Sequence, residues 1–202
     1  MDLSNSKEVI QALRERLEAV EHADVLVDAL ESYRPTARKA SVLMGLFEQH
    51  NEIYLVFIRR ANTLRAHRGE IAFPGGAVDP TDVSLIQTAM REAQEEIGLD
   101  PSRVEVLGIM QPVFTVVSNF LITPVVGYLP EGPGLLQLQT SEVAEVLLLP
   151  LQRLADPAIF HTEEWMRDGM RRTVYFYDYG SYRIWGATAR ILNGLLQLLD
   201  DS

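Results

Sequence analysis

The sequence predicts an α/β fold of the α+β type in a single domain. Three observations favour it: apolar residues recur at helical spacing in three segments, apolar runs typical of strands lie between them, and helices and strands do not alternate regularly. A chain of 202 residues with 47% hydrophobic residues can bury one sizeable core. We therefore expect one domain over residues 1–202, in which residues 1–34 form an N-terminal helical extension.

The N-terminal quarter predicts a helix and then a hairpin. Residues 7–30 show the periodicity of a helix that covers a domain, and Pro35 interrupts it. Four apolar residues carry this periodicity at three- and four-residue spacing: Ile10, Leu13, Leu17 and Val20. The runs 40–47 and 53–58 then predict two paired strands, because a short polar turn separates them.

The rest of the chain predicts one central helix, one closing helix and several strands. Residues 84–97 form the central helix, because their apolar residues stack along one side and Gly98 follows as a stop. Residues 185–199 form the closing helix on the same grounds. Apolar runs bounded by turn residues predict the strands, at 70–73, 104–110, 121–129, 143–149 and 172–179.

The composition excludes several classes of function. The chain has no cysteine, so any metal must have oxygen or imidazole ligands, and a cysteine nucleophile is excluded. Charges throughout the N-terminal segment predict no signal peptide, and no stretch is long and apolar enough to span a bilayer. The net charge of −10 argues against general binding to nucleic acid or to an anionic membrane. We expect a soluble, cytoplasmic protein that acts on a small molecule.

The central helix ends in a cluster of acidic residues. Glu92, Glu95 and Glu96 fall in a narrow sector, because each residue turns a helix by about 100°. Like charges at these spacings oppose helix formation, and Arg91 offsets only part of the repulsion. A solvated acidic face is the ordinary explanation of such a cluster. A divalent cation, Mg²⁺ or Mn²⁺, would also remove the repulsion, since hard cations prefer carboxylate oxygens.

The segment from Gly76 to Leu99 resembles the signature of the Nudix hydrolase family, G-x5-E-x7-R-E-U-x-E-E-x-G-U, in which U is aliphatic. The second half matches position by position from Arg91, with the small Ala93 at one aliphatic position. In the first half, Asp82 replaces the glutamate, and eight residues instead of seven separate it from Arg91. The sequence leaves open whether Asp82 makes the arginine contact of that glutamate. The resemblance implies a Nudix-like α/β/α sandwich with a mixed β-sheet between helices.

The longer loop and the segment upstream are similar to the coenzyme A pyrophosphatase branch of this family. That branch has an additional motif, L-L-T-x-R-(S/A)-x3-R-x3-G-x3-F-P-G-G. This chain has the corresponding residues at the same spacings: Arg60-Ala61, Arg65, Gly69 and Phe73-Pro74-Gly75-Gly76. The run 56–58 replaces the leading L-L-T and keeps the character of a buried strand. The run 182–189 also resembles the start of the closing helix in that branch.

The resemblance implies a metal site and its chemistry. It implies hydrolysis of a pyrophosphate bond by attack of water on phosphorus, which converts coenzyme A into 4'-phosphopantetheine and adenosine 3',5'-bisphosphate. Glu92 and Glu96 are expected to bind the ion directly, Glu95 to bind a second ion or a water molecule, and Arg91 to orient the glutamates. The backbone carbonyl of Gly76 is a further candidate ligand.

The same resemblance gives the arginine-rich run 59–68 a role in substrate binding. Arg60 and Arg65 are expected to bind substrate phosphates, because a planar guanidinium pairs with phosphate oxygens at two points. Gly75 and Gly76 would lie beside them at the substrate. Arg59 and Arg68 are weaker candidates, although a basic run most often faces solvent.

Several alternatives stay open at this point. The general base is one of the three glutamates, Glu142 or Glu145. The substrate is coenzyme A or a derivative, or else ADP-ribose or a dinucleotide. A nucleotide sensor without activity is a further alternative, which the retention of all three glutamates disfavours. The sequence does not decide between Mg²⁺ and Mn²⁺, and it is compatible with a homodimer.

Overall fold

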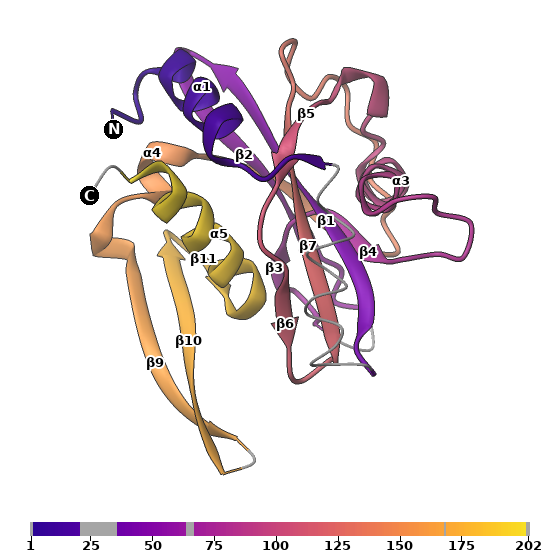
Figure 1. Ribbon diagram of the computed structural model, residues 1–202, viewed down its shortest axis with the longest axis vertical. Coiled ribbons are helices and arrows are strands. Elements are labelled where there is room, and N and C mark those ends of the chain that lie inside the picture. The colour runs from indigo at the N-terminus through magenta and orange to yellow at the C-terminus, as the bar shows by residue number, and fades with distance from the viewer. Residues whose placement is uncertain (1, 21–35, 64–66, 168, 201–202) are drawn as a thin grey trace.

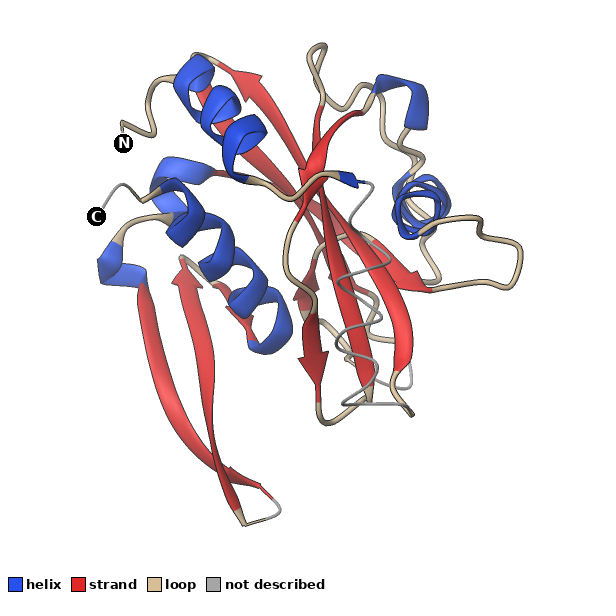
Figure 2. Cartoon of the chain, viewed as in Figure 1, coloured by secondary structure: helices blue, strands red, loops and turns tan. Residues whose placement is uncertain are grey.

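A β-sheet lies between helices in the computed structural model, which describes residues 2–20, 36–63, 67–167 and 169–200. Helix α3 (Leu85–Ile97) covers one face, while α1 (Ser6–Arg16) and α5 (Gly186–Leu199) cover the other (Figure 2). The sandwich of helix, mixed sheet and helix that the resemblance implied is therefore confirmed.

The two central strands send side chains alternately into two apolar cores. Strand β1 (Arg38–Gln49) directs Met44 and Leu46 toward α1 and α5, and it directs Leu43 and Phe47 toward α3. Strands buried on both faces read as continuous apolar runs. This is why the runs 40–47 and 53–58 predicted β1 and its hairpin partner β2 (Glu52–Arg60) correctly.

The remaining elements of this sheet have the bounds β3 (Ile71–Ala72), β4 (Gly75–Ala77), β5 (Glu105–Ile109), β6 (Val113–Thr115), β7 (Phe120–Tyr128) and β8 (Val143–Pro150). The main path runs β3, β2, β1, β7, β5, while β4 pairs with β1, β6 with β7 and β8 with β2. The sheet is mixed because β1 pairs parallel with β7 and antiparallel with β2. The sequence missed β4 and β6, which are only three residues long.

The N-terminal helix is shorter than predicted. Helix α1 begins after Asn5, whose side chain accepts from the Glu8 N–H, and ends at Arg16. The expected helix over 7–30 is wrong at residues 17–20, because Leu17 is extended and Glu18 pairs with Ile109 through two backbone hydrogen bonds of 3.0 and 3.1 Å. Residues 21–30 of that prediction lie outside the described residues. None of the described helices is long and apolar enough to cross a membrane.

A second, three-stranded sheet packs against α5. It consists of β9 (Phe160–Arg167), β10 (Met170–Tyr179) and β11 (Tyr182–Trp185), and β10 lies in the middle. The helix α4 (Leu151–Leu154) and a short 3-10 turn (Pro157–Ile159) connect it to the main sheet. The predicted strand at 172–179 is β10. The run 182–185 is strand β11 and not the start of the closing helix, because it pairs with β10, and α5 begins only after Trp185.

Candidate active site

The Phe73-Pro74-Gly75-Gly76 segment brings backbone against the acidic helix. Phe73 is buried and stacks on Phe57 with ring centroids 4.5 Å apart, which anchors the segment in the core. Strand β4 then pairs with residues 40–42 of β1. Gly75 has a φ of 155°, and a Cβ there would collide with the carbonyl oxygen of Ser41. Only glycine allows this close approach.

Helix α3 presents its polar side to this segment. The Ser84 hydroxyl caps the first turn by accepting from the Gln87 N–H at 3.1 Å, and Gly98 ends the helix in the left-handed conformation at φ 67°. Its apolar side packs into the core between α3 and the main sheet through Leu85, Ala89, Ala93 and Ile97. The register of the helix therefore fixes where its acidic residues point.

Glu96 is a buried carboxylate at the end of α3. It is 2% exposed and accepts a 2.9 Å hydrogen bond from the Gly75 N–H. The guanidinium of Arg60 lies 3.7 Å away. Burial raises the pKa of Glu96 from its ordinary 4.5 to about 7, while Gly75 and Arg60 lower it in part and the negative charges of Glu92 and Glu142 raise it further. The charge of this carboxylate is thus incompletely compensated.

Glu92 and Glu95 differ in their surroundings. A Cβ on Gly76 would lie 2.5 Å from the carboxyl carbon of Glu92, so the glycine leaves room for this carboxylate. Burial raises the pKa of Glu92, although Arg91 at 3.0 Å counteracts the shift. The Glu95 side chain is 61% exposed and pairs with Arg91 at 3.1 Å. The glutamates therefore share one side of the helix without meeting at one point.

Asp82, in the loop between β4 and α3, binds the guanidinium of Arg91. Its Nε donates to Asp82 Oδ1 at 2.9 Å and its Nη2 donates to Oδ2 at 3.0 Å. A further bond of 3.2 Å runs from Nη2 to the Ala77 carbonyl. The hydrogen bonds from Arg91 hold the pKa of Asp82 well below its usual range. The contact that the sequence left open is present, and Arg91 is thereby fixed beside Glu92 and Glu95.

Arg60 and Arg59 end β2 in different environments. The Nε of Arg60 is buried and has no hydrogen-bond partner among the described residues. Arg59 instead donates to Glu145 at 2.9 Å, and the other oxygen of Glu145 accepts from Tyr182 at 2.9 Å. A register shift between Arg59 and Arg60 in the pairing with β8 separates the two surroundings. Arg60 therefore retains unused donor capacity beside Glu96.

The structure brings together most of the residues that the sequence singled out. Around the end of β2, β4 and α3 lie Arg60, Gly75, Gly76, Arg91, Glu92 and Glu96, with Glu95 at the rim. Arg65 lies outside the described residues. No sequence pattern predicted two supporting groups, the Ala77 carbonyl and the buried hydroxyl of Thr88, which donates to Asp82 at 2.8 Å.

The donor set fits a hard divalent cation. Within the described ranges, no group of three or more Asp, Glu or His side chains is arranged to hold a metal ion as it stands. Glu92 and Glu96 nevertheless supply carboxylate oxygens whose negative charge is disfavoured by burial, as their raised pKa values show. A cation beside them would relieve that cost, and oxygen ligands suit Mg²⁺ or Mn²⁺.

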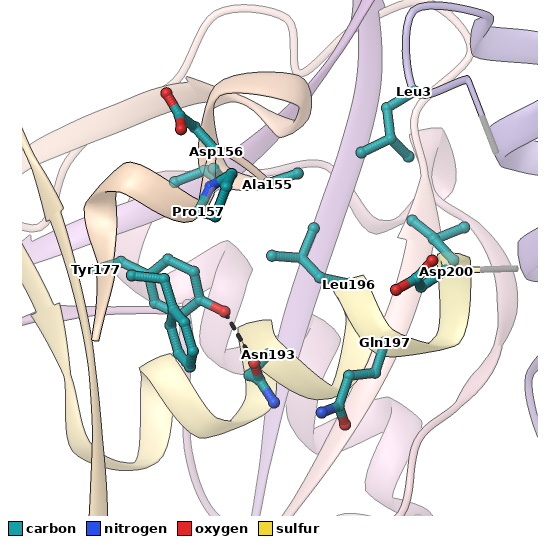
Figure 3. A pocket seen from close by; sticks show the side chains of 12 residues that line it. Leu3, Ala155, Asp156, Pro157, Tyr177, Asn193, Leu196, Gln197 and Asp200 are labelled. Carbon is teal, nitrogen blue, oxygen red and sulfur yellow. Dashed lines mark hydrogen bonds between the residues drawn. The ribbon is translucent and has the colours of Figure 1, made fainter. Parts of the chain in front are cut away.

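Two pockets lie on the other side of the sheet, around α5. One has a volume of about 360 Å³ and the other about 380 Å³. In the first, the Tyr177 hydroxyl donates to the Asn193 side chain at 3.2 Å among apolar residues such as Leu196 (Figure 3). Both pockets belong to the layer of α1 and α5, so neither contains the acidic side of α3.

Comparison with solved structures supports the fold. A MutT/nudix family protein from Enterococcus faecalis superposes with a TM-score of 0.53 at 16% identity, over 86% of this chain and 74% of that one. A NUDIX hydrolase from Alicyclobacillus acidocaldarius gives a TM-score of 0.52 at 20% identity, over 80% of this chain and 91% of that one. At these identities the likeness concerns the fold alone.

Comparison of sequences identifies the family. The NUDIX domain model matches residues 37–171, which include β4, α3 and their loop. An uncharacterized Nudix hydrolase NudL from Photorhabdus laumondii is 43% identical over 160 residues, which cover 79% of this chain and 84% of the relative. A protein of the same name from Cronobacter sakazakii is 42% identical over 159 residues, or 78% of this chain and 81% of the relative. The chain therefore belongs to the Nudix hydrolase family.

Proposed function

We propose that this chain hydrolyses the pyrophosphate bond of coenzyme A or of a coenzyme A derivative, with Mg²⁺ or Mn²⁺ as cofactor. Membership of the family makes a nucleoside diphosphate derivative the general class of substrate. The observation that carries the narrower proposal is the buried Nε of Arg60, for which no described residue supplies an acceptor, in a guanidinium that lies beside Glu96. It lies in the segment that resembles the coenzyme A pyrophosphatase branch, and a guanidinium donor there suits a phosphate oxygen.

The residues have distinct roles in this proposal. Glu92 and Glu96 would hold the cation, with Glu95 at the rim, and the cation would supply positive charge to the phosphates when bound. Arg91 fixes the side of α3 that carries these carboxylates, through Asp82. Arg60, together with Arg65, would bind the diphosphate.

The absence of side chains at Gly75 and Gly76 leaves room for the Glu92 carboxylate and for strand β1. A side chain at either position would displace a neighbour, since a Cβ on Gly76 would meet the Glu92 carboxylate and one on Gly75 would meet β1. The two glycines therefore allow Glu92 and β1 to lie directly against the backbone of β4, beside which the diphosphate would bind.

A proton acceptor must activate the attacking water. Glu142 is exposed and close enough to Glu92 and Glu96 to raise the pKa values of both. Glu145 already accepts from Arg59 and Tyr182. We therefore favour Glu142 as the base. Water adds across the P–O–P bridge, so that the products are 4'-phosphopantetheine and adenosine 3',5'-bisphosphate.

A substrate panel tests the proposal. The chain is incubated with free, oxidised and acylated coenzyme A, ADP-ribose and a diadenosine polyphosphate, each with Mg²⁺ or Mn²⁺, and the products are identified by mass spectrometry. We expect the highest kcat/KM for a coenzyme A compound. Faster hydrolysis of ADP-ribose or of the dinucleotide would mean that this compound, and not coenzyme A, is the preferred substrate. Intact substrates throughout would favour the sensor without activity.

A further inference from the structure

Strands β9 and β10 extend beyond the rest of the molecule as a two-stranded ribbon. Figure 1 shows them running together away from α5 toward a free tip. β11 pairs only with residues 176–179 of β10, so the part nearer the tip has no third strand. Apolar side chains are exposed there: Trp165 at 44%, Met166 at 66% and Met170 at 54%. A two-stranded ribbon of this kind is only marginally stable in water by itself.

The outer edge of the ribbon is strand β9. β10 pairs with it on one side, and no described strand pairs with it on the other. The edge therefore presents a row of unpaired backbone N–H and C=O groups over eight residues. An edge of this length is a template for another strand unless it is covered.

The two faces of the ribbon differ. One face packs against the main body through Phe160, Tyr175 and Tyr177. The other face carries an aromatic cluster, in which His161 stacks on Phe176 with ring centroids 4.9 Å apart and Trp165 lies 5.8 Å from Trp185. Side chains alternate along a strand, so the odd-numbered residues of β9 lie on this second face.

The charges of β9 are self-complementary about Trp165. Glu163 precedes Trp165 by two residues and Arg167 follows it by two, so all three side chains share one face. The Glu163 carboxylate also accepts from the Trp165 indole at 2.7 Å and lies 3.8 Å from His161, which keeps it on this face. A twofold axis through Trp165 would place Glu163 opposite Arg167 of a second copy, twice.

We propose that two copies of this chain dimerise by antiparallel pairing of their β9 strands about Trp165. The two three-stranded sheets then join into one sheet with Trp165 on the twofold axis and a Glu163–Arg167 ion pair on each side. Such a contact is isologous, as a closed dimer requires. It covers the edge and buries part of the exposed Trp165 and Met166.

Other symmetric registers lack this match. A twofold axis perpendicular to the sheet keeps the same face upward in both copies, so only odd residues face odd residues and even face even. Centring the pair on Glu163 or Glu164 would oppose two glutamates, which is unfavourable. Centring it on Met166 would oppose Glu163 to Gly169 and lose both ion pairs. Among the registers centred on residues 163–166, charge therefore favours the one about Trp165.

Charge reversal tests the register. Sedimentation over a concentration series compares the full wild-type chain with Glu163→Arg and Arg167→Glu, each alone and mixed in equal amounts. We expect the wild type to dimerise. Each variant alone should have a dimer Kd at least about tenfold higher, because like charges then face each other twice. The mixture should form a heterodimer, since both contacts become attractive again. The double variant Glu163→Arg/Arg167→Glu should dimerise like the wild type.

Three results would overturn the proposal. They are a wild type that stays monomeric at concentrations on the order of 0.1 mM, single variants that dimerise as well as the wild type, and a mixture that stays monomeric. Circular dichroism of each single variant verifies that the exposed substitutions leave the fold intact. The double variant gives a second check, because a folding defect would not be repaired by the opposite reversal.

Discussion

Asp82 and Arg91 form a two-point pair, with Nε to Oδ1 at 2.9 Å and Nη2 to Oδ2 at 3.0 Å. The family signature places a glutamate one residue closer, so a shorter side chain spans a longer loop here. The loop makes this contact possible through a turn, in which the Asp82 N–H donates to the Asp79 carbonyl at 2.9 Å. Thr88 and the Asp79 N–H also donate to Asp82. Contacts other than those with Arg91 therefore also position the Asp82 carboxylate.

Replacing Asp82 with asparagine should destabilise the fold in a pH-dependent way. The Asp82 side chain is 1% exposed and its pKa is lowered, chiefly by the hydrogen bonds from Arg91. Loss of a buried partner should cost about 2–4 kcal/mol of unfolding free energy at pH 7. A group with a lowered pKa stabilises the fold above its unfolded pKa of about 3.9 and loses this effect as the pH falls toward the folded value.

Urea unfolding of the wild type and Asp82→Asn between pH 7 and pH 3 measures this difference. It should be constant above about pH 5 and shrink below about pH 4. A difference that does not change with pH would mean that the ion pair does not carry the stabilisation. Asp100→Asn is the matched control: Asp100 is exposed, and chiefly hydrogen bonds from Ser102 lower its pKa, so its effect should have the same sign but a smaller size.

The sequence predicted those parts of the fold that are buried on both faces or amphipathic. β1 and β2 are continuous apolar runs, and the apolar side of α3 and its stop at Gly98 are both visible in the sequence. β9 was missed because its residues are exposed and mostly polar, so no apolar pattern marks it. The helical pattern continued past Arg16, but backbone pairing of Glu18 with Ile109 overrides it. Such long-range pairing has no local signal.

For the candidate site too, the sequence predicted local positions but not tertiary contacts. The spacing of Glu92, Glu95 and Glu96 placed them on one side of a helix, as the structure has them. It could not show that Glu96 is buried against Gly75 while Glu95 faces solvent, because that depends on where β4 crosses the helix. The sequence also could not show that Glu145, unlike Glu142, accepts hydrogen bonds from β2 and β11, because those strands are distant in sequence.

Replacing Glu96 with glutamine should stop turnover and stabilise the metal-free protein at high pH. In the folded chain the pKa of Glu96 is about 7, against an ordinary 4.5. A raised carboxyl pKa makes folding less favourable as the pH rises from the unfolded to the folded pKa, and the cost is constant above it. Glutamine avoids this cost, and its oxygen can still accept from the Gly75 N–H.

Thermal melts with a chelator should therefore give a higher Tm for Glu96→Gln than for the wild type at pH 8, and similar values near pH 4. Added Mg²⁺ should raise the Tm of the wild type and leave that of the variant nearly unchanged. Turnover should fall by more than about tenfold, or ~1.4 kcal/mol of transition-state stabilisation. A variant that keeps most of its activity, or responds to Mg²⁺ as the wild type does, would remove Glu96 from the metal site.

Replacing Arg60 with alanine should weaken substrate binding more than replacing its neighbour Arg59. The buried Nε of Arg60 has no acceptor in the described part of the chain, whereas Arg59 is already paired with Glu145. Loss of a charge-assisted hydrogen bond to phosphate costs about 1.5–3 kcal/mol, so the kcat/KM for coenzyme A should fall roughly 10- to 150-fold. Steady-state kinetics of both alanine variants measures this. Equal losses would show that Arg60 only supports the strand.

Replacing Glu142 and Glu145 separately should distinguish the two candidate bases. Glu142 is exposed and its negative charge raises the pKa values of Glu92 and Glu96, which places it beside the carboxylates that would hold the cation. Removing a general base lowers kcat by about 10²- to 10⁴-fold. We expect Glu142→Gln to show this loss with an unchanged Tm, because no side-chain hydrogen bond in the described part of the chain depends on its carboxylate.

Glu145→Gln is the matched control, because Glu145 lies three residues further on, inside β8, which Glu142 immediately precedes. Its carboxylate joins Arg59 to Tyr182, so the substitution should lower stability by about 1 kcal/mol, the usual scale of a partly exposed ion pair, and leave kcat within about tenfold of the wild type. Thermal melts and the dependence of kcat on pH, measured for both variants, separate the two roles. If kcat falls steeply in Glu145→Gln and is retained in Glu142→Gln, the base is Glu145, and the network through Tyr182 belongs to the chemistry. If both variants keep their activity, one of the three glutamates of α3 must accept the proton.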